Sequence, residues 1–316
     1  MNPYHFISMN ARLISAVTTL SVGSAIVYAQ EAFQLPALAL EKDGAIARVW
    51  VVAATKNSVR YKETEVSSTT VDRKLSDLES IYVFEPSPLS EAIDVFESRK
   101  FSEAKAQFAA IREQCETIAP LPGGPAVIAA FYELESMRKL GDLEGLAKAM
   151  ERFIKDPLVL DAQQKQVELY VMWDALRTES WERLETLAKN YENTSLSGNL
   201  RAQVAYLHGK ALEGLERPKE ALIPYAIAMT ADAGDSVEVA GPAALRVLAI
   251  HLADEEVKTA MKVWGTKDEN KNGAGYSDLI EAAAIAELYE LSLGAGNPLP
   301  AEAKELSKFR VKVAQG

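Results

Sequence analysis

The sequence predicts an α+β protein that is mainly α, in which a small antiparallel β module precedes a right-handed α-solenoid of about six helix-turn-helix pairs. Three observations predict this class. Short runs rich in β-branched and aromatic residues, separated by turn residues, occupy residues 44–85. From residue 87 to the end, helix-like runs alternate with short polar connectors. Along this second part, small residues recur roughly every forty residues at equivalent places of successive pairs.

Residues 1–29 have the features of a cleaved signal peptide. Arg12 supplies positive charge, Leu13–Val27 is an uncharged and largely apolar run, and Val27–Ala29 offers a small-x-small cleavage site. The run is short for a membrane span, which needs about 20 residues. A retained anchor or an N-terminal helix is the alternative. We therefore expect export, to a bacterial periplasm or cell envelope, with no transmembrane span after the signal is removed and with residues 30–43 as a linker.

Composition excludes some classes of partner. The net charge is −11 over 316 residues, so no basic excess is present to neutralise phosphates, and a nucleic-acid partner is not expected.

The single cysteine, Cys115, cannot form an internal disulfide, so the fold depends on its hydrophobic core. We expect Cys115 to be a small buried apolar residue; an intermolecular disulfide is the alternative.

Residues 44–85 are expected to form a small β-sheet or a curled barrel. The segment 45–53 is apolar on both faces, and Val59–Lys62 alternates apolar with charged residues, as a half-buried strand does. Residues 69–71 and 81–84 add two shorter strands. Roughly forty residues without a disulfide are marginal for independent folding, so the module is expected to dock on the first helices.

The helical part, residues 87–316, is divided by its connectors into pairs. Ala104, Gly145, Leu184 and Ala221 stand at equivalent places in the second helices of the first four pairs, 41, 39 and 37 residues apart. The expected helices are 89–98 with 102–117, 126–140 with 143–154, 161–177 with 181–191, a pair within 205–229, 242–252 with 254–264, and 277–293 with 301–313.

The pair within residues 205–229 has the clearest pattern. Small or large apolar residues follow one another at Gly209, Leu212, Ala221, Tyr225 and Ala228, and a polar connector with a proline separates the two helices. At these offsets the stretch resembles a tetratricopeptide repeat. The spacing between pairs is longer than the 34 residues of that family, so the chain is similar to the family, with an extra turn or a longer loop in each unit.

The resemblance implies a functional surface. In the family, the first helix of each repeat lines a concave face that binds peptide segments of partner proteins. Carried onto the best-matching pair, the outward positions of the first helix are Gln203, Tyr206, Lys210 and Glu213. Tyr206 with Lys210 could hold an extended peptide or its C-terminal carboxylate.

No catalytic or cofactor-binding signature is present. The chain has three histidines, His5, His208 and His251, and no spacing typical of a zinc site, a nucleophile elbow, a phosphate loop or a dinucleotide site. One loop resembles the start of an EF-hand, with oxygen ligands at Asp268, Asn270 and Asn272, but the place of its bidentate glutamate is Leu279. We therefore expect no cofactor and no metal, with this loop as a calcium candidate.

The sequence as a whole indicates an exported, non-enzymatic scaffold that binds partner segments in the groove of its helical repeats. Two alternatives stay open: an exported hydrolase or sugar-processing enzyme that uses groove carboxylates, and a structural component of an envelope complex. A scaffold predicts a long shallow groove, whereas an enzyme predicts titratable groups gathered in one pocket.

Overall fold

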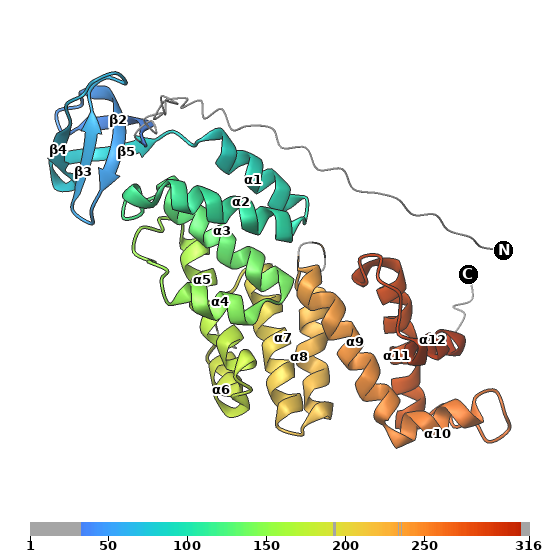
Figure 1. Cartoon of the computed structure of the whole chain (residues 1–316). Coiled ribbons are helices and arrows are strands. Elements are labelled where there is room, and N and C mark those ends of the chain that lie inside the picture. Colours follow the sequence, from blue (N-terminus) through green and yellow to red (C-terminus); the bar gives the residue numbers. More distant parts are fainter. Residues whose placement is uncertain (1–32, 192–193, 233, 235, 311–316) are drawn as a thin grey trace, which may run out of the picture. The chain divides into compact units, whose positions relative to one another are not determined.

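The computed structural model describes residues 33–191, 194–232, 234 and 236–310 (Figure 1). The chain from Phe33 onward forms one compact unit. Its described part is an antiparallel sheet followed by helices, so the predicted α+β, mainly α class is confirmed. The predicted signal peptide, residues 1–29, lies outside the described residues.

The sheet has five strands in the order β4-β3-β2-β1-β5, all antiparallel. Strands β4 and β5 are its two edges, so strand pairing within the described chain gives an open sheet and not the barrel that we considered. The strands are β1 (Leu35–Glu41), β2 (Ile46–Ala54), β3 (Ser58–Lys62), β4 (Val71–Lys74) and β5 (Leu78–Val83).

The expectation of a linker over residues 30–43 is wrong: its described part contains β1, an inner strand of the sheet. Strand β1 pairs with β2 on one side and β5 on the other. Its alanines and Pro36 have low strand propensity, and this is why the sequence indicated a tether. Pro36 stands at the start of the strand, and its carbonyl accepts a hydrogen bond from the Phe84 N–H at 3.0 Å. Pairing on both sides overrides the local preference.

The sheet packs one face on the first helices, as expected. Alternate residues of β1, β2 and β3, among them Ala37, Val49 and Val51, are buried. They share one hydrophobic core with Leu89 and Phe108, which come from the first two helices. The β module and the start of the helical part are therefore held by a common core.

The helices follow the predicted order, with small differences at their ends. In the described part of the expected last helix, 301–313, residues 301–304 form one helical turn and Glu305–Phe309 a 3₁₀ segment; residues 311–313 lie outside the described residues. The helices are α1 (Ser87–Glu97), α2 (Phe101–Gln114), α3 (Pro125–Leu140), α4 (Leu143–Met150), α5 (Asp161–Arg177), α6 (Trp181–Tyr191), α7 (Gly198–Gly214), α8 (Pro218–Thr230), α9 (Val237–Ala253), α10 (Glu255–Val263), α11 (Ala274–Leu288) and α12 (Ala301–Lys304).

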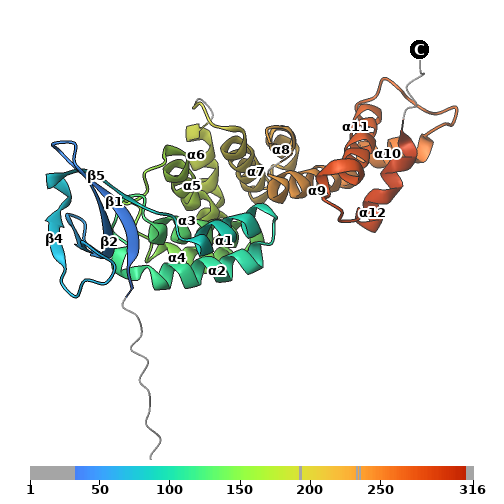
Figure 2. The same cartoon turned by 90° about the horizontal axis from the view of Figure 1, so that it is seen from above.

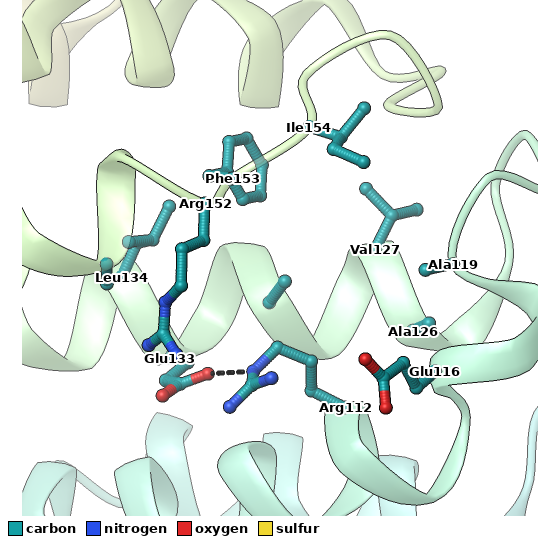
Figure 3. A pocket seen from close by; sticks show the side chains of 12 residues that line it. Arg112, Glu116, Ala119, Ala126, Val127, Glu133, Leu134, Arg152, Phe153 and Ile154 are labelled. Atoms are coloured by element: carbon teal, nitrogen blue, oxygen red, sulfur yellow. Dashed lines mark hydrogen bonds and ion pairs between the residues drawn. The ribbon is translucent and has the colours of Figure 1, made fainter.

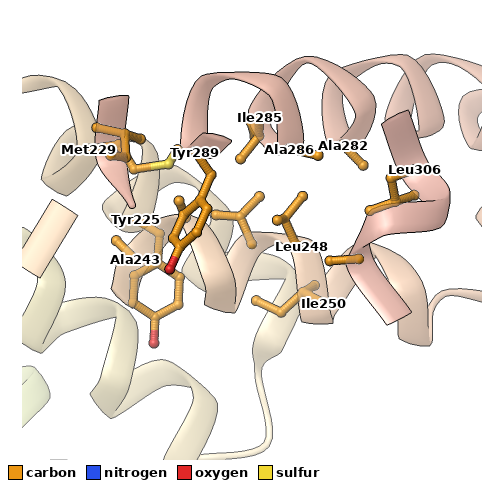
Figure 4. Close-up of a cluster of buried hydrophobic side chains, with 14 of the residues drawn as sticks. Tyr225, Met229, Ala243, Leu248, Ile250, Ala282, Ile285, Ala286, Tyr289 and Leu306 are labelled. Atoms are coloured by element: carbon orange, nitrogen blue, oxygen red, sulfur yellow. The ribbon is translucent and has the colours of Figure 1, made fainter. Parts of the chain in front are cut away.

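Successive helices pack on one another along the chain, and α5 to α8 lie side by side in both views (Figures 1 and 2). In addition, the first helices of neighbouring pairs touch: α5 packs on α7, α7 on α9, and α9 on α11. Figure 4 shows the core that joins the last pairs, where Tyr225 and Met229 of α8 meet Leu248 of α9 and Ile285 of α11. Burial is thus shared between neighbouring pairs.

Four of the helical pairs turn in the same way. The connectors of α1/α2, α3/α4, α5/α6 and α7/α8 each hold one residue in the left-handed region: Arg99 (φ 61°), Gly141 (φ 71°), Glu179 (φ 51°) and Glu216 (φ 60°). In each case the next helix begins two residues later. The residue after the left-handed one donates its backbone N–H to the carbonyl five positions earlier in the chain, for example from Lys100 to Val95. This hydrogen bond is typical of a Schellman-type helix end. The connector of α9/α10 does not share this conformation, because Asp254 there is extended (φ −73°, ψ 129°).

The residues at the four recurring positions of the helical pairs have different roles. Ala104, Leu184 and Ala221 are fully buried between helices. Gly145 is not: a Cβ there would meet the carboxylate of Asp142 at 2.5 Å. Asp142 caps α4 by accepting a hydrogen bond from the Gly145 N–H at 3.0 Å. The small residue of the second pair therefore serves the helix cap and not a close approach of two helices.

The α7/α8 pair packs through a glycine and a tyrosine. A Cβ on Gly209 would lie 2.5 Å from the ring of Tyr225, so the ring of Tyr225, and not the backbone at Ala221, occupies the space that Gly209 leaves. Tyr225 and Ala221 are both fully buried.

We expect Ala221→Leu to overpack this pair. Three further side-chain carbons have no free space at a fully buried position, so the free energy of unfolding is expected to fall by about 1–3 kcal/mol. Urea denaturation measures the change. The exposed Ile223→Leu in the same helix is the matched control and should leave the midpoint in place. An unchanged midpoint for Ala221→Leu would contradict the packing of α8 described above.

No helix in the described part of the chain is both long enough and apolar enough to cross a bilayer.

Candidate functional site

The four residues that the resemblance pointed to do not form one exposed row. Gln203 is fully buried, so its expected outward orientation is wrong. Its amide pairs with that of Gln166 through two hydrogen bonds of 3.0 and 2.8 Å, and its oxygen also accepts from the Trp173 indole at 3.0 Å. Asn199 accepts a further bond from the Gln203 amide at 2.7 Å. Gln203 therefore joins α5 to α7 and does not face a partner.

Glu213 is also committed to internal contacts. Its side chain is 11% exposed and forms a bidentate ion pair with Arg246 of α9, with a shortest distance of 2.6 Å. It also accepts a hydrogen bond from the Tyr225 hydroxyl at 2.5 Å. Burial would raise the pKa of Glu213, but its bonds to Arg246 and Tyr225 lower it. Tyr206 and Lys210 are half-buried, as Glu213 is.

A second polar cluster, which the sequence did not reveal, links α3, α5 and α9. The Arg138 side chain is fully buried and donates to both oxygens of Glu135 at 2.8 and 2.9 Å. It also donates to Glu238, 100 residues further along the chain, at 3.0 Å. Lys139 donates to Glu238 at 2.8 Å, and the Tyr170 hydroxyl donates to Glu135 at 2.7 Å. We call these five residues the α3–α9 clamp.

The clamp makes the stability of the fold depend on pH. Burial would raise the pKa of Glu238, but the charges of Arg138 and Lys139 lower it below its ordinary value. A carboxylate with a lowered folded-state pKa stabilises the fold above the unfolded value of about 4.3, and this contribution is lost as the pH falls through the folded pKa.

The expected result is a fall in the free energy of unfolding between about pH 5 and about pH 3, measured by urea denaturation. In Glu238→Gln, stability at neutral pH should be lower and the slope over this window smaller. Equal slopes for the two proteins would show that Glu238 is not paired as described.

The clamp and the glutamine pair border a cleft of about 550 Å³, which we call the α3–α5–α7 cleft. It is formed by the first helices of three successive pairs, with Phe96 of α1 at its side. Aromatic rings make one wall: the ring centre of Tyr132 lies 5.2 Å from that of Phe96 and 5.4 Å from that of Phe131. The other lining residues are Glu135, Lys139, Leu160, Asp161, Ala162, Gln163, Lys165, Gln166, Ser195, Ser197, Asn199 and Leu200.

The carboxylates of this cleft are engaged. Both oxygens of Glu135 accept from Arg138, and Asp161 forms an ion pair with Lys165 at 2.8 Å. Leu160, in contrast, is 57% exposed and lines the same cleft as Tyr132. The cleft therefore offers apolar and aromatic surface with amide and hydroxyl groups around it, which is a surface that fits a peptide segment.

A larger groove lies on the opposite side of α7, between α6 and α8. It measures about 780 Å³ and includes the exposed Ile223 and Ile227 of α8. Its two carboxylates, Glu185 and Glu220, are both bonded to Arg217. This groove lacks the aromatic wall of the α3–α5–α7 cleft.

Figure 3 shows a smaller pocket, of about 260 Å³, between the end of α2, α3 and the end of α4. Arg112 donates to Glu133 at 2.7 Å in its lining, and Val127 and Phe153 are among its apolar residues. Arginine and glutamate side chains balance each other there, so the pocket has no net charge to select an ionic ligand.

The calcium candidate, Asp268, Asn270 and Asn272, stays a prediction. The Asn270 side-chain oxygen accepts from the Asn272 N–H at 3.2 Å, so it closes its own turn. Asp268 lines a shallow cleft beside α10 and α11. Among the residues that the structure describes, no group of three or more His, Cys, Asp and Glu side chains is placed to hold a metal ion.

Cys115 is buried, as expected, in the core that joins the sheet to the first helices. Burial raises the pKa of its thiol to about 11. We expect the folded protein at about pH 8 to resist a maleimide, because the reactive thiolate is scarce and covered. Labelling that is complete only in urea would confirm this, and rapid labelling of the folded chain would contradict it.

The remaining histidines lie inside helices and not in a common site. His251 is 2% exposed near the end of α9, whereas His208 of α7 lines the groove between α6 and α8. They do not lie together in any of the clefts described above.

Comparison of the chain with models of protein families, with curated proteins and with solved structures gives no match. The resemblance of residues 205–229 to a tetratricopeptide repeat therefore stays a prediction, and the function has to be inferred from the geometry of the clefts.

Proposed function

We propose that this chain is an exported, non-enzymatic interaction protein that binds a peptide segment of a partner protein in the α3–α5–α7 cleft. The observation that carries the proposal is the lining of this cleft: first helices of three successive pairs supply an aromatic wall beside Tyr132 and a polar rim. Peptide recognition by helical hairpin arrays uses this kind of surface.

The repeated connector supports the same proposal. In four pairs, the residue two positions before the second helix has a left-handed backbone conformation. This recurrence is expected of an array in which the same helical hairpin is repeated. The proposed array therefore consists of α1 to α8, with the later helices extending it. Export is proposed on the apolar run and cleavage pattern of residues 1–29.

The hydrolase alternative receives no comparable support. A carboxylate that acts as general acid or base has to exchange a proton with a substrate. Both carboxylates of the α3–α5–α7 cleft are held by cations, Glu135 by Arg138 and Asp161 by Lys165.

Site-specific photo-crosslinking tests the proposal. A benzophenone amino acid placed at Leu160, in the cells that make the protein, is expected to give an adduct with a partner chain. The same group at Ile223, which is 72% exposed in the groove between α6 and α8, is the matched control and should give little. Ala162→Trp, which narrows the cleft, should lower the yield at Leu160. A yield at Ile223 equal to that at Leu160 would overturn the proposal.

A further inference from the structure

The sheet has one face on the protein core and one that no described helix covers. The outward face follows from the strand register. Leu38 of β1 lies opposite Arg48 of β2 and Tyr82 of β5, and Trp50 of β2 lies opposite Lys62 of β3. Their sequence neighbours on the same strands, such as Ala37 and Val49, point inward and are buried.

The charges on this outer face are mostly positive, although the whole chain is acidic. Four basic side chains and one acidic side chain point outward from strands β2, β3 and β4. Arg60 is paired with the acidic one, Asp72, at 2.9 Å. In the described chain, no carboxylate lies within ion-pair distance of the other three, which are Arg48, Lys62 and Lys74.

The same face carries exposed apolar side chains. Ile46 is 67% exposed, Tyr82 is 62% exposed and Phe84 is 37% exposed. The rings of Tyr82 and Phe84 meet edge to face, with centres 5.8 Å apart. The guanidinium of Arg48 lies over the ring of Trp50, 5.3 Å from its centre. We call this surface the outer sheet face.

We propose that the outer sheet face binds the surface of an anionic lipid bilayer. Aromatic rings and an aliphatic side chain beside basic residues match the interface between acyl chains and headgroups. Tyrosine and tryptophan rings are enriched at that level, and basic side chains reach the anionic headgroups above it.

Two observations favour a bilayer over a single-stranded nucleic acid, which also binds aromatic and basic surfaces. Base stacking needs free ring faces, but Arg48 covers one face of Trp50, and Tyr82 and Phe84 are turned toward each other. Ile46, which is 67% exposed, adds aliphatic surface, which supports insertion among acyl chains and not stacking.

The place of the sheet in the chain agrees with this proposal. The apolar run of the predicted signal ends at Val27, and strand β1 begins at Leu35. Seven intervening residues span at most about 25 Å when extended. While the run is in a membrane, as a signal before cleavage or as a retained anchor, the sheet is therefore held within reach of the bilayer surface.

Vesicle flotation tests the inference on the chain from residue 30 onward. This chain keeps every residue of the three hydrophobic cores and lacks the apolar run, which would bind lipid by itself. Circular dichroism and a melting curve check its fold. Binding is expected with vesicles that contain phosphatidylcholine and about one third phosphatidylglycerol, and is expected to weaken with salt. Phosphatidylcholine vesicles should bind much less.

Two variants assign the binding to the outer sheet face. Arg48→Gln with Lys62→Gln is expected to lower the partition coefficient about 30-fold, and Ile46→Ser with Tyr82→Ser should lower it as well. The matched controls are Lys148→Gln with Lys271→Gln and Ile223→Ser with Leu291→Ser, which change exposed residues of the helical part and should bind as the parent chain does.

Equal binding of the sheet variants and the parent chain would overturn the inference. Tighter binding of single-stranded oligonucleotide than of vesicles would overturn it too, in favour of a nucleic-acid surface. The inference is separate from the peptide proposal, because the sheet variants leave the α3–α5–α7 cleft intact and should still crosslink from Leu160.

Discussion

Arg138→Met is expected to lower the free energy of unfolding by about 3–5 kcal/mol. The Arg138 side chain is fully buried and neutralises two carboxylates, Glu135 and Glu238. Methionine fills a similar volume, but it donates no hydrogen bond. Among the clamp residues, Tyr170 is then the donor that remains for Glu135. The cost is therefore that of a buried charge without its counter-charge, and not only that of a lost ion pair.

Urea denaturation at neutral pH measures this effect, and two further variants show its origin. Arg177→Met removes a partly exposed arginine that pairs with Asp174 and Glu144, so it should cost only about 0–1 kcal/mol. Arg138→Met combined with Glu135→Leu should recover part of the loss, because the buried carboxylate is removed as well. If Arg138→Met and Arg177→Met had the same cost, Arg138 could not be buried as described.

Tyr225→Ala is the second large effect, with an expected loss of about 3–5 kcal/mol. The ring is fully buried and fills the space above Gly209, so truncation leaves a cavity between α7 and α8. The variant also removes the hydrogen bond from the hydroxyl to Glu213. Both consequences act on the core that joins α8 to α9 and α11 (Figure 4).

Tyr225→Phe separates the two contributions. It keeps the ring and loses only the bond to Glu213, a hydrogen bond to a charged group, so a loss of about 1.5–3 kcal/mol is expected. The lower end is favoured because Glu213 keeps its bidentate pair with Arg246. Thermal and urea unfolding should place Tyr225→Phe between the parent chain and Tyr225→Ala. Equal losses for the two variants would show that the ring contributes little by packing.

The ends of the helices were predictable where local signals act alone. The third pair was predicted at Asp161–Arg177 and Trp181–Tyr191, and both ranges are confirmed. Polar connectors and helical periodicity are local properties, so one sequence is enough to read them. Strand β1 was missed for the opposite reason, because its alanines become a strand only through pairing with β2 and β5.

The candidate site was less predictable than the fold. Gln203 was expected to face outward, yet it is buried because Gln166, Trp173 and Asn199 satisfy its amide from neighbouring helices. Glu135 and Arg138 were not among the expected site residues. Their burial depends on Glu238, and a partner 100 residues away leaves no local pattern in the sequence.

The α3–α9 clamp has a consequence for cooperativity. Helical arrays whose units touch only their neighbours can fray one hairpin at a time from either end. Here Arg138 and Lys139 of α3 are both paired with Glu238, so opening α9 leaves Lys139 without this carboxylate and Arg138 with Glu135 alone. Amide hydrogen exchange should therefore report one common opening for α3 to α9, and a fragment that ends at Thr230 should lose protection as far back as α3.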